Sequence, residues 1–123
     1  TGRPRRCGWI DIPQLLYTIM LNGVTQVIIT KLDVLDTFET IEVAKTYQYD
    51  NMESEELPFD IVDKSIDPVY QSSDGWYESL DNVRSYQDLP AKAKDYIQHL
   101  EQLLKTRISM VSTGPEREKL FGK

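Results

Sequence analysis

The stretch that decides the fold is Val24-Thr25-Gln26-Val27-Ile28-Ile29-Thr30-Lys31-Leu32-Asp33. Its first six residues are rich in β-branched side chains and too few for a comfortable helix, so they predict a buried strand. Lys31 and Asp33 then follow the carboxyl end of that strand, where open α/β sheets bind ligands. An aspartate carboxylate can accept hydrogen bonds from N1–H and the exocyclic amine of guanine, and a lysine stem can cover the base. The stretch predicts a guanine-binding loop, with a plain turn capped by Asp33 as the alternative.

The composition excludes several classes of protein. The 123 residues suffice for one domain with a modest core. A net charge of −6 argues against a general nucleic-acid binder or a membrane-surface protein. The single cysteine, Cys7, excludes an internal disulfide framework and suits a reducing compartment. One histidine and one cysteine do not make a zinc site without many carboxylates, and no apolar stretch approaches the length of a membrane span.

The first half of the chain carries clear helix and strand signals. Asp11 is placed to cap a helix that begins at Ile12-Pro13 and stops at Asn22-Gly23. A short helical turn is expected after Asp33, over residues 34–36. Alternation over Thr40–Tyr47 predicts a strand with one wetter face, and the polar residues 48–57 predict a hairpin or loop.

The second half is dominated by one amphipathic helix. Residues 59–70 alternate weakly and predict one or two short strands, and Asp74-Gly75-Trp76 predicts a turn that presents an aromatic ring. The apolar stripe over Leu89–Thr106 predicts a helix, with Asp88 as its cap and Pro90 in its first turn.

A second strand and loop complete the pattern set by Lys31 and Asp33. Arg107–Val111 predicts another buried strand, which ends in the tight loop Ser112-Thr113-Gly114-Pro115 ahead of a charged tail. If the two strands are parallel neighbours, both loops leave the same sheet edge and can frame one base. Hydroxyl or backbone N–H groups of the second loop would then meet the guanine O6. The alternative is an ordinary loop after an edge strand.

The amino end is strongly basic. Thr1-Gly2-Arg3-Pro4-Arg5-Arg6 contains three guanidinium groups, which bind carboxylates and phosphates through two-pronged hydrogen bonds. A frayed basic terminus is the alternative. The chain lacks an initiator methionine and opens inside this loop, whereas domain boundaries usually fall in bland linkers. We therefore expect a fragment of a longer protein.

Three motifs, taken together, resemble one family. Thr1–Trp9, Thr30–Asp36 and Ser112–Pro115 resemble, in order and spacing, the carboxyl-terminal part of adenylosuccinate synthetases. The resemblance covers essentially the whole chain, including Gly75-Trp76. It implies an α/β fold: the carboxyl-terminal portion of a larger, mostly parallel-sheet, P-loop-NTPase-like enzyme, with a long helix and a β-hairpin region. Residues 1–123 would form a single carboxyl-terminal segment.

The resemblance implies a GTP-dependent ligase of purine biosynthesis. Such an enzyme joins IMP and L-aspartate into adenylosuccinate, on the route to AMP, and releases GDP and phosphate. The IMP oxygen attacks the GTP γ-phosphate, and the aspartate amine then displaces phosphate. Mg²⁺ and charged groups stabilise the transferring phosphoryl group. The resemblance also implies a cytoplasmic homodimer, without a nucleic-acid or membrane partner.

The family's aspartate and IMP contacts map onto the basic loop. By position, Thr1, Gly2 and Arg3 match the mobile aspartate-binding loop, and Arg3 also matches the residue that reaches IMP. Arg5 matches an arginine that engages the aspartate carboxylate and lies near GTP.

The family's guanine contacts map onto the two strand-end loops. Lys31, Leu32 and Asp33 match the guanine-recognition segment, in which Asp33 is the discriminating acceptor. Ser112, Thr113 and Gly114 match the second guanine loop, with Pro115 beside the base.

The chain contains no phosphate loop and no nucleophile paired with a base. In the family, that loop, the catalytic aspartate and histidine, the magnesium ligands and most IMP contacts would lie upstream of Thr1. We therefore expect no catalytic or metal-binding residue here, and we predict that the isolated chain binds GTP poorly and catalyses no ligation. A measurable ligase rate from the purified chain would refute this.

The competing hypotheses are a non-enzymatic guanine-nucleotide binding module and a small interaction domain whose arginine loop docks an acidic partner.

Overall fold

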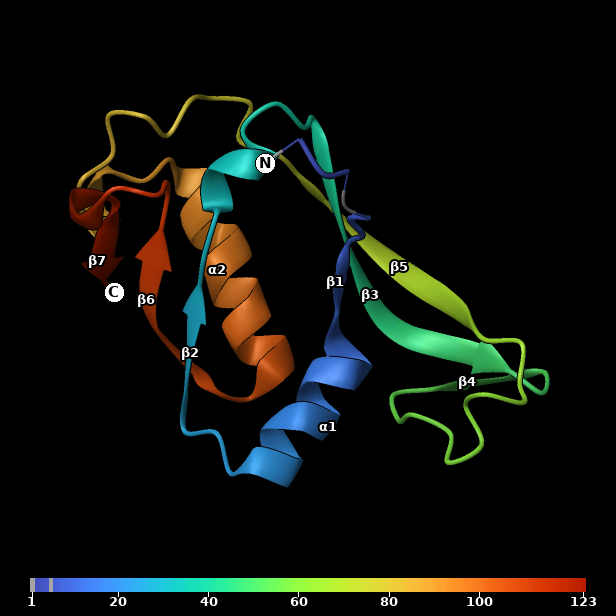
Figure 1. Ribbon diagram of the computed structural model, residues 1–123. Helices are drawn as coiled ribbons and strands as arrows, with labels where there is room; N and C mark the ends of the chain where they lie inside the picture. Colours follow the sequence, from blue (N-terminus) through green and yellow to red (C-terminus); the bar gives the residue numbers. More distant parts are fainter. Residues whose placement is uncertain (1, 5) are drawn as a thin grey trace.

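The computed structural model describes residues 2–4 and 6–123, which form a mixed α/β structure with two sheets and two helices (Figure 1). Two sheets flank α2, and α1 lies at one end of the molecule (Figure 1). The elements in chain order are β1 (Ile10–Asp11), α1 (Ile12–Asn22), β2 (Gln26–Ile29), the 3₁₀ turn η1 (Leu32–Leu35), β3 (Thr40–Tyr49), β4 (Met52–Ser54), β5 (Asp67–Asp74), η2 (Tyr86–Asp88), α2 (Ala91–Leu104), β6 (Arg107–Ser112), η3 (Arg117–Lys119) and β7 (Leu120–Gly122). The expected α/β class is confirmed at this level, and the larger P-loop-like fold stays a prediction.

The strand pairing is mixed within the described residues. In the first sheet β1 runs parallel to β3, and β3 pairs antiparallel with both β4 and β5. In the second sheet β2 runs parallel to β6, and β6 pairs antiparallel with β7. Among the described residues, parallel pairing is limited to β1–β3 and β2–β6, and the mostly parallel sheet of the larger enzyme stays a prediction.

Helix α1 has the predicted bounds and caps. The Asp11 carboxylate accepts a hydrogen bond from the Gln14 N–H at 3.0 Å and so satisfies one of the free donors at the helix start. Gly23 ends the helix in the left-handed conformation, with φ of 59°. Both signals are local, which is why the sequence predicts them correctly.

Helix α2 is shorter than predicted and has a different amino end. It spans Ala91–Leu104, and Pro90 occupies the cap position without a capping side chain. Asp88 does not cap it, because its carboxylate accepts a hydrogen bond from the Ser85 hydroxyl at 2.8 Å. The apolar stripe is buried as expected and forms much of the core: Ala93, Tyr96, Ile97, Leu100 and Leu104, with Leu103 half-buried. Among the described residues, no helix combines the length and apolarity that crossing a membrane requires.

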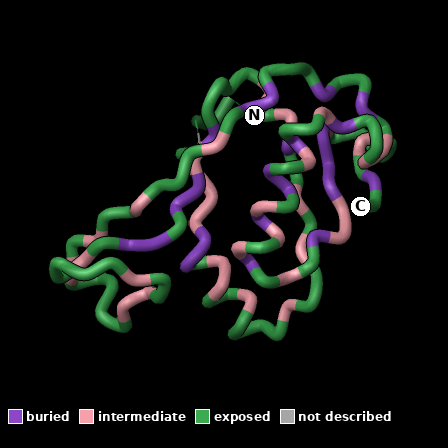
Figure 2. Tube along the Cα trace, turned by 180° about the vertical axis from the view of Figure 1, so that it is seen from behind, coloured by how far each residue is buried: buried purple, intermediate pink, exposed green. Residues whose placement is uncertain are grey.

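Strand β2 exists but is not buried, which corrects the first expectation. It pairs on one side only, with β6, and Ile28 keeps 51% of its surface exposed. Figure 2 shows buried residues along α2, β3 and β6 instead. A strand that is apolar on both faces is covered on both faces only when other elements pack there. Within the described residues, β2 is an edge strand.

The hairpin predicted within residues 48–57 is present, but the strand that follows it departs from the prediction. Asp50 and Asn51 connect β3 to β4, and both have positive φ, at 50° and 61°, as a tight two-residue hairpin turn requires. In place of short strands over residues 59–70, one eight-residue strand, β5, begins at Asp67 and pairs along β3. The bounds of β5 depend on its pairing with β3, which lies far away in the sequence, so the local alternation of residues did not predict them.

The turn at Gly75 buries its aromatic ring rather than presenting it. Trp76 is 7% exposed, and its indole N–H donates to the Asp36 carboxylate at 2.9 Å. Gly75 allows the close approach, because its N–H donates to the Glu39 carbonyl at 2.8 Å and its Cα lies against the Phe38 backbone.

The carboxyl-terminal tail is ordered rather than merely charged. Its final strand, β7, pairs with β6 and places Phe121 in the core at 8% exposure. The three residues Leu120–Gly122 are too few for the sequence alone to predict a strand. They form one because they pair with the edge of β6.

We predict that Gly75→Ala destabilises the protein by roughly 1–3 kcal/mol, because overpacking forces backbone shifts. A Cβ at this position would lie 1.9 Å from the Phe38 carbonyl oxygen, which is too close for any contact. The midpoint of thermal unfolding, measured on the intact protein, checks this. Gly122→Ala is the matched control, since its Cβ would meet nothing nearer than the Ser109 oxygen at 3.9 Å. Equal midpoints for both variants would contradict the prediction.

Candidate functional site

The two predicted guanine loops leave neighbouring parallel strands. The register pairs Gln26 with Arg107 and Ile29 with Val111, so β2 and β6 end at the same edge of their sheet (Figure 1). The turn η1, which follows β2, contacts β6 directly. The sequence hypothesis required parallel neighbours, and the structure confirms that part of it.

The first loop holds Lys31 at the surface and Leu32 inside. Lys31 adopts the left-handed conformation, with φ of 59°, and turns the chain from β2 into η1. Non-glycine residues in this conformation are sparse and cluster at ligand-binding sites. Leu32 is 1% exposed and anchors the turn in the core. The loop therefore has one exposed cation, one buried anchor and, next to them, the carboxylate of Asp33.

Asp33 has an unusual carboxylate. Its Oδ1 atom is buried and has no hydrogen-bond partner among the described residues. A buried acceptor without a partner costs about 1–3 kcal/mol, and more when it is charged, so native structures contain few of them. Asp33 is half-buried as a residue. The expected helical turn is present, but Asp33 is its second residue, so the side chain does not cap it.

The second loop is closed by its own hydrogen bonds. The Ser112 hydroxyl donates to the Gly114 carbonyl at 2.8 Å, and the Thr113 N–H donates to the Lys119 carbonyl at 3.0 Å. Thr113 is fully buried, and its hydroxyl oxygen has no partner within the described part of the chain. Unpartnered side-chain oxygens thus lie in both loops, at the ends of adjacent strands.

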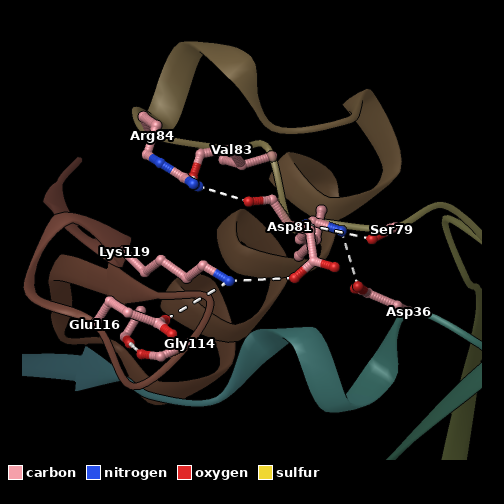
Figure 3. A network of polar contacts seen from close by, with 10 residues as sticks. Asp36, Ser79, Asp81, Val83, Arg84, Gly114, Glu116 and Lys119 are labelled. Atoms are coloured by element: carbon pink, nitrogen blue, oxygen red, sulfur yellow. Dashed lines mark hydrogen bonds and ion pairs between the residues drawn. The ribbon is translucent and has the colours of Figure 1, made fainter.

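Lys119 covers the second loop. Its stem passes over Gly114, where an added Cβ would come within 2.3 Å of the Lys119 Cδ atom. Its ammonium group lies 3.1 Å from the Asp81 carboxylate and 3.7 Å from Glu116 (Figure 3). The hydrogen bond to Asp81 is the main cause that raises the pKa of Lys119 above its ordinary value. The sequence analysis missed Lys119 and Asp81, since nothing local links residues so far apart.

The basic loop is placed only in part. Gly2, Arg3 and Arg6 are exposed and lie outside helices and strands. Thr1 and Arg5, which the resemblance assigns to aspartate, IMP and GTP, lie outside the described residues. After the loop, the Trp9 ring packs edge-on against Phe38 at 5.3 Å between centroids. This contact ties the end of the basic loop to the segment that follows η1.

The described residues contain no group of three or more histidine, cysteine, aspartate or glutamate side chains that could hold a metal ion. The Asp33 carboxylate stands apart from such an arrangement.

The family model for adenylosuccinate synthetase matches residues 1–121. The chain belongs to this family. It is 43% identical over 123 residues to an adenylosuccinate synthetase of Flavobacterium psychrophilum, covering all of this chain and 29% of the relative. It is 48% identical over 118 residues to that of Porphyromonas gingivalis, covering 96% of this chain and 28% of the relative. The chain thus spans less than a third of the length of these synthetases.

A solved structure shows the same arrangement. The fully ligated adenylosuccinate synthetase of Plasmodium falciparum superimposes with a TM-score of 0.88 at 36% identity. The match covers 98% of this chain and 30% of that synthetase. At this identity and score the two segments share their fold, which places β2, β6 and the loops after them in a synthetase framework.

Proposed function

We propose that this chain is the segment of a GTP-dependent adenylosuccinate synthetase that recognises guanine and holds the aspartate loop. The intact enzyme would join IMP and L-aspartate into adenylosuccinate and release GDP and phosphate. The observation that carries the proposal is the buried, unpartnered Oδ1 atom of Asp33 at the end of β2. Family membership over residues 1–121 supports the same conclusion.

Guanine supplies what the Asp33 carboxylate lacks. The N1–H and the exocyclic amine are adjacent donors on one edge of the base, and a carboxylate accepts both at once. Hydrogen bonds to a charged acceptor are worth about 1.5–3 kcal/mol each. Adenine offers no such pair of donors on that edge. Asp33 is therefore the residue that selects the nucleotide.

The other loop residues complete the base site in this proposal. The Lys31 stem covers one face of the ring. Ser112, Thr113 and Gly114 border the O6 side, where the unpartnered Thr113 hydroxyl is a candidate donor. Leu32 contributes indirectly, because its buried side chain fixes the position of the loop that carries Lys31 and Asp33.

The phosphoryl chemistry lies with other residues. The IMP oxygen would attack the γ-phosphorus of GTP and displace GDP, and the aspartate amine would then displace inorganic phosphate. Arg3 and Arg5, with Thr1 and Gly2, would hold the aspartate and IMP through their guanidinium and backbone donors. Mg²⁺ would be bound by other residues of the intact enzyme and would stabilise the charge on the transferring phosphoryl group. The cytoplasmic location and the homodimer stay predictions.

Asp33→Asn in the intact protein should relax the preference for guanine. The amide presents one acceptor and one donor, so it no longer matches two adjacent donors on the base. We expect the ratio of kcat/KM for GTP over ITP, which lacks the exocyclic amine, to fall about tenfold. Steady-state kinetics with both nucleotides measures this. Asp67→Asn, at an exposed aspartate that begins β5, is the control. An unchanged ratio in Asp33→Asn would remove guanine recognition from this loop.

Arg3→Gln in the intact protein should weaken the use of aspartate and IMP. Loss of a two-pronged guanidinium contact raises KM for these substrates about tenfold or more, and KM for GTP changes little. Arg107→Gln is the control, since this exposed arginine begins β6 at the end away from the loops. Equal effects of the two variants on KM for aspartate and IMP would contradict the role of Arg3.

A further inference from the structure

We propose that Asp36, Asp81 and Lys119 are positioning residues that hold the two guanine loops at a fixed separation. They do so through one shared segment, Trp76–Arg84, which we call the bridge. The inference rests on the proposed function, because it concerns the same base site. Figure 3 shows the polar contacts that join the two loops to the bridge.

Asp36 attaches the first loop to the bridge. One carboxylate oxygen accepts from the Trp76 indole N–H at 2.9 Å, and the other accepts from the Leu80 N–H at 2.8 Å. The Asp36 N–H in turn donates to the Asp33 carbonyl at 3.1 Å. Asp36 thus connects the backbone of the guanine-selecting residue to two buried residues 40 and 44 positions away.

Lys119 attaches the second loop to the same place. Its ammonium group binds the Asp81 carboxylate, and its carbonyl accepts from the Thr113 N–H at 3.0 Å. Its side chain is only 14% exposed, because its stem lies over Gly114. Leu80 and Asp81 are consecutive, so the anchors of the two loops are separated by a single peptide unit.

The bridge is itself well fixed. Trp76 and Leu80 are buried, and the Trp76 ring packs against Tyr96 of α2 at 6.0 Å. The Val83 N–H donates to the Leu80 carbonyl at 3.1 Å. The Arg84 guanidinium donates to the carbonyls of Asp81 and Val83 at 2.6 and 2.9 Å. The bridge can therefore serve as a common reference for both loops.

A common reference matters because a purine is rigid. The Asp33 carboxylate and the Ser112–Gly114 loop would contact different edges of one flat ring, so their separation must match the width of the base. Binding groups need to be held within about 0.5 Å of the productive geometry, by contacts that do not touch the ligand. Asp36 and Lys119 are placed to do this from outside the site.

Asp36→Asn in the intact protein tests the first attachment. The amide cannot accept from both the Trp76 and Leu80 N–H groups, and its own NH₂ would face one of these donors. We expect KM for GTP to rise about tenfold and the GTP-over-ITP ratio of kcat/KM to fall, while kcat and the KM values for IMP and aspartate stay within about twofold. Asp88→Asn is the matched control, because that carboxylate also accepts a side-chain hydrogen bond, but from Ser85, three residues away. It should change none of these constants.

Lys119→Met and Lys119→Arg test the second attachment. The methionine keeps much of the apolar stem over Gly114 but loses the bond to Asp81, and the arginine restores a cation. We expect Lys119→Met to raise KM for GTP about threefold to tenfold, and Lys119→Arg to recover most of the loss. Asp81→Asn, whose side chain is 78% exposed, should reproduce Lys119→Met without a folding defect.

The outcomes separate this inference from the proposed function. If Asp33→Asn lowers the GTP-over-ITP ratio but neither Asp36→Asn nor Lys119→Met affects KM for GTP, the positioning role is wrong and the guanine site stands. If Asp33→Asn leaves the ratio unchanged, the guanine site itself is wrong. A fall in kcat and unfolding temperature in Asp36→Asn, with every KM unchanged, would indicate a merely structural role and overturn the inference.

Discussion

The parallel pairing of β2 with β6 is the constraint on which the candidate site depends. Parallel strands end at the same sheet edge, so the loops that follow them meet there whatever their own sequences. The register Ile29 with Val111 brings Asp33 and Thr113 to that edge within a few residues of the last paired position. Both side chains carry an oxygen that finds no partner among the described residues. The sheet therefore brings together two polar side chains whose hydrogen-bonding capacity is not fully used.

This pairing is supported by the rest of the fold. Some 77 residues separate the end of β2 from the start of β6, and closing so long a connection costs entropy that grows slowly with length. Helix α2 compensates with Ile97 and Leu100, which are almost fully buried. The Glu101 carboxylate then accepts from the Ile108 N–H at 2.8 Å, which fixes the start of β6 against the helix end. Strands β3, β4 and β5 of the first sheet and the bridge lie within the same connection, and the Trp76 ring of the bridge packs against Tyr96 of α2.

Local signals in the sequence predicted much of this fold. The bounds of α1 followed from Asp11 and Gly23, because capping depends on residues within one turn. The buried stripe of α2 followed from its period. The prediction from sequence was wrong where the interacting residue lies far away along the chain. It placed the Trp76 ring at the surface, whereas the indole N–H donates to Asp36, 40 residues earlier. It also left the last residues as a tail, because only the edge of β6 makes β7 a strand.

The sequence by itself determined the elements and the chemistry at their ends: β2, β6, α1, most of α2, and the residue types in the loops after the two strands. Helix capping and the spacing of apolar residues depend on side chains only a few positions apart, so these features can be predicted from short stretches of sequence. Only the tertiary structure decided that the two loops share one edge and that Asp36 and Lys119 bind adjacent residues of the bridge. Lys119 and Asp81 are 38 residues apart, and such contacts arise from the packing of the whole chain rather than from any local pattern.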